Sequence, residues 1–150
     1  MARIYALSPS RKFVNAAMST LIKVGVGSAS MYLMTTTGRR TGEPRTTPVT
    51  LVESDGERWL VAPYGNVSWV HNVTARPVLE LRRGRHRETL SAERVDASTA
   101  APILRQYVQK VAVTRPYFDA QPQDDLQAFI AEASKHPVFR LTNPTAEQPT

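Results

Sequence analysis

The chain has 150 residues and a formal net charge of +6, from 19 lysines and arginines against 13 aspartates and glutamates. This length fits one domain with a hydrophobic core of its own. Because cysteine is absent, disulfides, thiolate chemistry and cysteine-ligated zinc are excluded, and the positive charge favours anionic partners.

The first residues predict a helix rather than a secretory leader. Ser8 precedes Pro9, which is typical of a helix start, and apolar residues recur at helical spacing up to residue 24. The polar run at 8–12 interrupts any leader-like apolar core, and the apolar run at 24–34 is too short to span a bilayer. We expect a cytoplasmic protein whose helix at about 8–24 packs on the core or closes over a site, with contact to a membrane surface as the alternative.

Residues 31–48 predict two strands joined by a basic loop. Threonines, aliphatic residues and an aromatic residue form the first strand, which is a composition that packs well on a pleated surface. In the loop, Gly38 and Gly42 permit backbone conformations in which successive N–H groups point at one ligand. Arg39, Arg40 and Arg45 add guanidinium groups that bind phosphate or carboxylate oxygens in pairs. The loop is therefore either an anion-binding cradle or the solvated tip of a basic hairpin.

The rest of the chain predicts a meander of short strands with a few helices. Further strands are expected at 48–52, 58–62, 78–81, 88–92 and 138–141, and helices at 68–73, from 96 to before 116, and from 124 to 136. The predicted helix caps and ends are Asn66 or Ser68, Asp96 or Ser98, the residue before Pro116, Asp124 with Asp125, and His136 with Pro137. A charged turn is expected at 82–87 and a flexible tail at about 143–150. We assign the fold class α+β, a barrel of about six antiparallel strands with helices packed outside, as a single domain over 1–150.

The sequence lacks the patterns of the commonest catalytic and nucleotide-binding sites. Ser68 and His71 lie one helical turn apart without an acidic residue to orient the histidine, and neither a Walker-type phosphate loop nor a GxGxxG fingerprint is present. The histidines, His71, His86 and His136, lie far apart, so no metal site is predicted. Aromatic residues make up 7% of the chain and do not alternate with the arginines, so nucleic acid is not an expected partner.

Residues 64–72 suggest a place for a planar ligand. Gly65 lets the backbone approach a ligand closely, and Trp69 and Asn72 share one face of the short helix. A flat ring system would stack there. The alternative is that Trp69 anchors the core and Asn72 is its hydrogen-bonded neighbour.

Two segments together resemble a known family. TTTGRRTGEPRTTPV, at 35–49, and APYGNVSWVHNVTARP, at 62–77, are similar to motifs of the deazaflavin-dependent nitroreductase family, the coenzyme F420-dependent reductases of actinobacteria. The resemblance is close over about 32–81 and holds in outline elsewhere. It implies a split β-barrel, as in FMN-binding proteins of that fold, which commonly forms a homodimer.

The resemblance also implies a cofactor and its contacts. Coenzyme F420 is expected, FMN less so, with its phosphate and oligoglutamate tail on Arg39, Arg40, Thr41 and Arg45. The ring system is expected near Pro48, Pro63, Tyr64, Gly65, Trp69 and Asn72. The reduced cofactor passes a hydride to a hydrophobic acceptor, which is an activated alkene such as an enone or coumarin-like lactone, a quinone or a nitro compound.

Departures from the family pattern leave the acceptor and the proton donor open. Some members carry a Ser-Lys pair where this chain has Pro63 and Tyr64, and a tyrosine where it has Thr50. Tyr64, Tyr117 and water are the candidates for donating a proton to the reduced acceptor. A noncatalytic protein of the same fold, holding a fatty acid or another planar ligand, is the alternative function, and the intact arginine loop argues against it.

Overall fold

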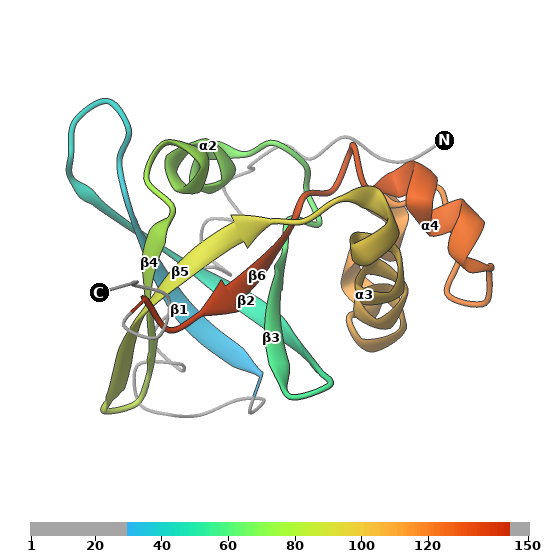
Figure 1. Cartoon of the computed structure of the whole chain (residues 1–150), viewed down its shortest axis with the longest axis horizontal. Coiled ribbons are helices and arrows are strands. Elements are labelled where there is room, and N and C mark those ends of the chain that lie inside the picture. Colours follow the sequence, from blue (N-terminus) through green and yellow to red (C-terminus); the bar gives the residue numbers. More distant parts are fainter. Residues whose placement is uncertain (1–29, 145–150) are drawn as a thin grey trace.

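The strands close into a barrel (Figure 1). A computed structural model describes residues 30–144, so the helix predicted at 8–24 and most of the tail predicted at 143–150 lie outside the described residues. The strands are β1 (Met31–Thr37), β2 (Pro44–Ser54), β3 (Glu57–Val61), β4 (Val78–Arg83), β5 (His86–Arg94) and β6 (Val138–Thr142). They pair antiparallel around the barrel in the order β1-β2-β3-β6-β5-β4. The predicted fold class is therefore confirmed.

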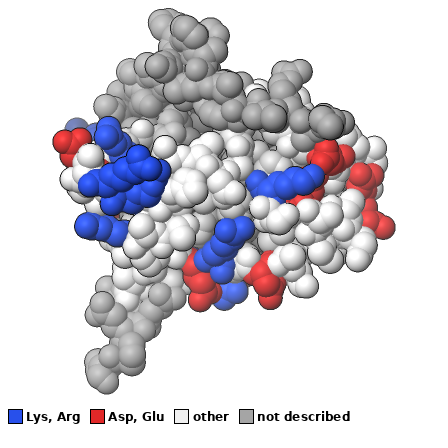
Figure 2. Space-filling model, turned by 90° about the horizontal axis from the view of Figure 1, so that it is seen from above, with Lys and Arg blue, Asp and Glu red and all other residues white. Residues whose placement is uncertain are grey.

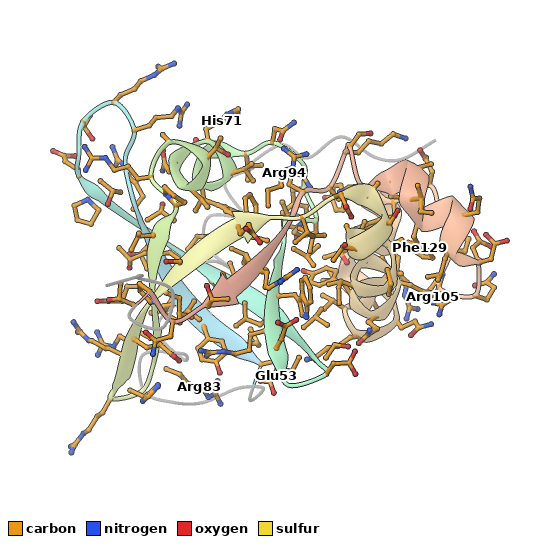
Figure 3. The ribbon with its side chains drawn as sticks, in the orientation of Figure 1. Glu53, His71, Arg83, Arg94, Arg105 and Phe129 are labelled. Carbon is orange, nitrogen blue, oxygen red and sulfur yellow. The ribbon has the colours of Figure 1, made fainter. Side chains whose placement is uncertain are left out.

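The helices lie outside the barrel. They are α2 (Ser68–Ala75), α3 (Ala97–Lys110), the 3-10 helix η1 (Ala112–Tyr117) and α4 (Leu126–Glu132). In Figure 1, α2 covers one end of the barrel, whereas α3 and α4 stand together at its side. Phe129 of α4 is fully buried and lies in the contact between these two helices (Figure 3).

Alternating residues of the strands supply two hydrophobic cores. Leu51 and Leu60 face each other across the β2–β3 ladder and belong to the cluster inside the barrel. Their neighbours Val52 and Trp59 point to the opposite face and belong to a second cluster with α3 and α4. Successive side chains of a strand point to opposite sides, so the same strands fill the barrel and bind the helices.

Turn chemistry explains why the strands meet in this register. Asp55 and Gly56 both have positive φ, 54° and 77°, as a tight two-residue hairpin between β2 and β3 requires. Asp96 caps α3 by accepting a hydrogen bond from the Thr99 amide at 2.8 Å. That cap was predicted, and Asp125 caps α4 in the same way, at 3.2 Å from the Ala128 amide.

Some predicted boundaries are wrong. Neither Asn66 nor Ser68 caps α2, because Val67 occupies the N-cap without a side-chain hydrogen bond, and backbone hydrogen bonds shape this end instead. The charged turn predicted at 82–87 is shorter, because pairing of β4 with β5 extends to Arg83 and His86. Pairing with β1 likewise starts β2 at Pro44 rather than at 48. Cross-strand hydrogen bonding extends these strands into residues whose local sequence predicts a loop.

An ion pair joins β3 to β5 across β6. The Arg58 guanidinium donates two hydrogen bonds to the Glu88 carboxylate, at 2.8 and 2.7 Å, and both side chains are partly buried. This hydrogen bonding by Arg58 holds the pKa of the Glu88 carboxyl below its ordinary value of 4.5. Because the folded-state pKa is lowered, the pair stabilises the fold fully above about pH 4.5 and loses that stabilisation as the pH falls through the lowered pKa.

Glu88→Gln is therefore expected to lower the free energy of unfolding at pH 7 by about 1–2 kcal/mol, because a charged bidentate pair is replaced by a neutral contact in a partly exposed setting. Urea unfolding at pH 7 and at about pH 3 measures the effect, which should shrink at the lower pH. Glu93→Gln on the same strand is the matched control, since Glu93 is exposed. A deficit that is equal at both pH values would contradict this role of the ion pair.

Candidate functional site

A cavity of about 1110 Å³ lies against one side of the barrel. Its walls are the arginine loop (residues 38–45), the first half of β2, the turn that follows β3, α2, and the end of α3 with the start of η1. All of the residues predicted to contact a cofactor line it, with the exception of Gly65. The lining members of that predicted set are Arg39, Arg40, Thr41, Arg45, Pro48, Pro63, Tyr64, Trp69 and Asn72. The fold thus brings the two motifs to one cavity.

The arginine loop is closed by its own backbone. The Gly38 amide donates to the Glu43 carbonyl at 2.7 Å, and the Gly42 amide donates to the Gly38 carbonyl at 2.8 Å. A Cβ on Gly38 would meet the Glu43 carbonyl oxygen at 3.0 Å and the Thr41 hydroxyl at 3.1 Å. Gly42 has φ of 75°, which favours glycine. The two glycines therefore set the loop shape, and the arginines project from it.

The loop carries positive charge that is little compensated. Within residues 30–144, the carboxylate at ion-pair distance from its arginines is that of Glu43, 3.7 Å from Arg45, and both side chains are well exposed. Figure 2 shows a group of Lys and Arg side chains at the left edge of the face, on the side where the arginine loop lies in Figure 1. Such an exposed cluster attracts anions.

Asn72 connects α2 to this loop. Its side-chain oxygen accepts hydrogen bonds from the Arg39 amide and from the Arg39 guanidinium, each at 3.1 Å, and its amide group donates to the Thr36 hydroxyl at 3.3 Å. Asn72 is buried, with 3% of its surface exposed. It therefore orients Arg39, which is a contact that neither sequence interpretation of Asn72 contained.

Residues 62–65 form a turn in the cavity wall, which we name the wall turn. The Gly65 amide donates to the Ala62 carbonyl at 3.3 Å, and Pro63 and Tyr64 occupy the corner between them. The Tyr64 ring meets the Tyr117 ring edge-on, with centroids 4.9 Å apart and planes at 84°. Tyr117 is buried behind Tyr64 and is not among the cavity-lining residues, so the two predicted proton-donor candidates differ in their access to the cavity.

Trp69 lies between the barrel core and the cavity. It packs against the barrel core with its ring centroid 6.0 Å from that of Phe139, and it also lines the cavity. His71, labelled in Figure 3, is an exposed residue of α2 that also lines the cavity.

The cavity is also lined by residues outside the predicted cofactor site. Tyr107, Val111, Val113 and Thr114 line its far end. Tyr107 belongs to the apolar stripe of α3, and a stripe by itself does not distinguish a core position from a cavity wall. Burial raises the pKa of Tyr107, so its hydroxyl stays protonated at neutral pH and can donate a hydrogen bond, although burial makes it a weaker acid.

Solved structures share this fold. A putative pyridoxamine 5'-phosphate oxidase from Listeria innocua matches with a TM-score of 0.55 at 10% identity, over 87% of this chain and 94% of that chain. An F420-H2 dependent reductase (FDR-A) matches with a TM-score of 0.55 at 23% identity, over 76% of this chain and 95% of that chain. A structure described as a domain-swapped dimer matches with a TM-score of 0.55 at 21% identity, over 90% of this chain and 100% of that chain. The closed barrel with outer helices is therefore that of the split-barrel proteins.

The family follows from the sequence match. The model of the family described as F420H(2)-dependent quinone reductase matches residues 9–131. Since this span covers most of the chain, the chain belongs to that family, and the resemblance drawn from the two motifs is confirmed. The protein is an F420-dependent reductase, and coenzyme F420 is its cofactor.

The cavity residues fit that cofactor. An anionic tail requires cationic and N–H donors, and the arginine loop presents Arg39, Arg40 and Arg45 at one end of the cavity with little acidic compensation. A planar ring requires flat apolar walls, which Tyr64 and Trp69 supply. When bound, the reduced cofactor supplies a hydride.

Two further observations concern other classes of site. Within the described residues, no group of three or more His, Asp or Glu side chains is placed to hold a metal ion. The same part of the chain contains no helix that is long and apolar enough to cross a membrane.

Proposed function

We propose that the cavity holds coenzyme F420 with its tail on the arginine loop and its ring at the wall turn, and holds a quinone in the apolar remainder. The change in polarity along the cavity carries this proposal. Arg45 and Thr50 both line the cavity on β2, and five residues of extended strand separate its charged end from its far end by about 17 Å. At the far end, Met31, Val111 and Val113 replace the arginines.

The register of the barrel supports the position of the ring between these ends. Leu51 pairs with Leu60, so the wall turn, which begins two residues after Leu60, stands beside the middle of the lining segment of β2. Pro48, Pro63, Tyr64, Gly65 and Trp69 would form the ring site, with Arg39, Arg40, Thr41 and Arg45 on the tail. Asn72 would act through Arg39.

The acceptor would bind against the ring on the side of α3. Apolar walls favour a flat hydrophobic molecule, and among quinones, enones, coumarin-like lactones and nitro compounds the family description supports the quinone. Tyr64 and Tyr107 line the cavity and are the candidate proton donors beside water.

The proposal treats 1–150 as one domain. It extends to a homodimer, since one similar structure is described as a domain-swapped dimer.

Titration with oxidised coenzyme F420 and, in parallel, with FMN tests the proposal. Cofactor fluorescence should report tight F420 binding that weakens as salt is added, because salt of about 0.1 M screens exposed charges beyond about 10 Å. FMN should bind less tightly, since it lacks the oligoglutamate tail. The protein with reduced F420 is then offered one acceptor of each class, and the quinone should be reduced fastest.

Each outcome has a distinct meaning. Absence of F420 binding would refute the placement of the cofactor. An F420 affinity that does not change with salt concentration would refute the placement of the anionic tail on the arginines. Faster reduction of a nitro compound or an enone would reassign the acceptor. Binding without reduction of any acceptor would favour the noncatalytic alternative.

A further inference from the structure

A buried acid and a buried histidine lie directly behind the wall turn. Glu132 and His136 have 2% and 4% of their surfaces exposed. One Glu132 carboxylate oxygen, Oε2, accepts a hydrogen bond from the Ala120 amide, and the other, Oε1, lies 3.6 Å from His136 Nε2. The imidazole stacks on the Phe118 ring, with centroids 3.9 Å apart and planes at 20°. Packing on one face and an acid at one edge thus hold the ring in place.

The other edge of the imidazole contacts the wall turn. His136 Nδ1 lies 3.3 Å from the Ala62 carbonyl oxygen and donates to it, because a carbonyl can only accept. The same carbonyl accepts the Gly65 amide, and the Ala62 amide donates to the Pro137 carbonyl at 2.9 Å. The turn that carries Tyr64 is therefore anchored to the connection between α4 and β6 at both polar groups of Ala62.

With its N–H on Nδ1, the imidazole turns its Nε2 atom toward Glu132. Burial lowers the pKa of His136, which favours the neutral ring, and the contact with the Ala62 carbonyl places its N–H on Nδ1. His136 Nε2 and Glu132 Oε1 then face each other at 3.6 Å, which is a polar contact and not a hydrogen bond. The stacking on Phe118 and the buried Glu132 carboxyl beside Nε2 together keep the ring in the orientation that donates to Ala62.

We propose that His136 is a positioning residue for the cofactor ring, with Glu132 orienting it in turn. His136 does not line the cavity and acts through the Ala62 carbonyl, which places Pro63 and Tyr64. The proposal rests on the placement of the ring at the wall turn. Its structural half, that His136 holds the turn, can be tested without any cofactor.

Amide hydrogen exchange of the protein alone tests the structural half. His136→Phe preserves stacking on Phe118 but cannot donate to Ala62, whereas His136→Asn offers a side-chain N–H near the position of Nδ1. Exchange at Ala62 and Gly65 should rise about 10-fold or more in His136→Phe, relative to the Met34 amide in β1, and should recover in His136→Asn. Equal changes at Ala62, Gly65 and Met34 would overturn the proposal, because they indicate only global destabilisation.

Kinetics per F420-binding site test the functional half. His136→Phe should lower kcat by roughly 10- to 100-fold, since misplacement of a reacting group by about 1 Å has an effect of that order. The KM for F420, which the distant arginine loop dominates, should change by less than about threefold, and His136→Asn should restore most of kcat. An unchanged kcat in His136→Phe, despite loosened amides at 62 and 65, would refute the role in positioning the ring.

Glu132 provides a second pair of variants should His136→Phe not fold. Glu132→Gln can accept from the Ala120 amide and donate to His136 Nε2, whereas Glu132→Met keeps the length of the side chain and can do neither. We expect Glu132→Gln to resemble the parent protein and Glu132→Met to resemble His136→Phe in both measurements. Equal behaviour of the two Glu132 variants would contradict the orienting role of Glu132. If the exchange results are as expected but F420 does not bind, the proposed function is refuted, whereas the structural role of His136 stands.

Discussion

Replacement of Arg39 and Arg40 together by alanine is expected to weaken F420 binding by roughly 100- to 10,000-fold. Each guanidinium would make charged hydrogen bonds to the anionic tail, and such bonds contribute about 1.5–3 kcal/mol per group. Two groups therefore supply about 3–6 kcal/mol, and every 1.4 kcal/mol is about tenfold in affinity. Cofactor fluorescence at fixed salt measures the change. Unchanged affinity would return the loop to the solvated-tip interpretation.

The β4–β5 hairpin supplies a control with the same change in net charge. Arg85 and Arg87 are exposed at the tip of that hairpin and do not line the cavity. Their joint replacement by alanine removes two positive charges without touching the proposed cofactor contacts. The affinity of this double variant for F420 should fall by less than about threefold at 0.15 M salt, where screening limits long-range attraction to about 8 Å. Equal losses in both double variants would mean that net charge, not the loop, binds the cofactor.

Asn72→Leu is expected to lower both stability and cofactor affinity. Leucine has a similar volume, so the main loss is polar: the buried Thr36 hydroxyl loses its donor, and the Arg39 amide and guanidinium lose their acceptor. Groups left without partners cost about 1–3 kcal/mol each, so the free energy of unfolding should fall by about 2–4 kcal/mol. Denaturant unfolding measures it. Thr74→Ala, at an exposed position of the same helix, should change it by less than about 1 kcal/mol.

The effect on affinity has to pass through Arg39. Asn72→Leu should weaken F420 binding about tenfold in the parent protein and much less in a protein that already carries Arg39→Ala, because residues that share one interaction are not additive. Fluorescence titration of the parent protein, the two single variants and the double variant completes this double-mutant cycle. Full additivity would mean that Asn72 affects the cofactor independently of Arg39.

Local sequence was sufficient for the strands and for the two motifs. The turn at Asp55 and Gly56 between two strand-like segments identifies the β2–β3 hairpin without any distant contact. Asp96 is a cap that depends only on Thr99, three residues away. Boundaries failed where a strand was extended by its neighbour, as at Pro44 and Arg83, because cross-strand hydrogen bonds depend on a partner that local sequence does not reveal.

The class of fold, the arginine loop and the family follow from the amino-acid sequence, because the motifs that indicate them are made of residues close together in the chain. Which distant residues share the cavity is visible only in the folded protein. Asn72 meets Arg39 across 33 residues of chain, and His136 meets Ala62 across 74. Tyr107 is equally hidden among the apolar residues of α3. Such contacts exist only because barrel closure brings remote segments together, and the orientation of the site depends on them.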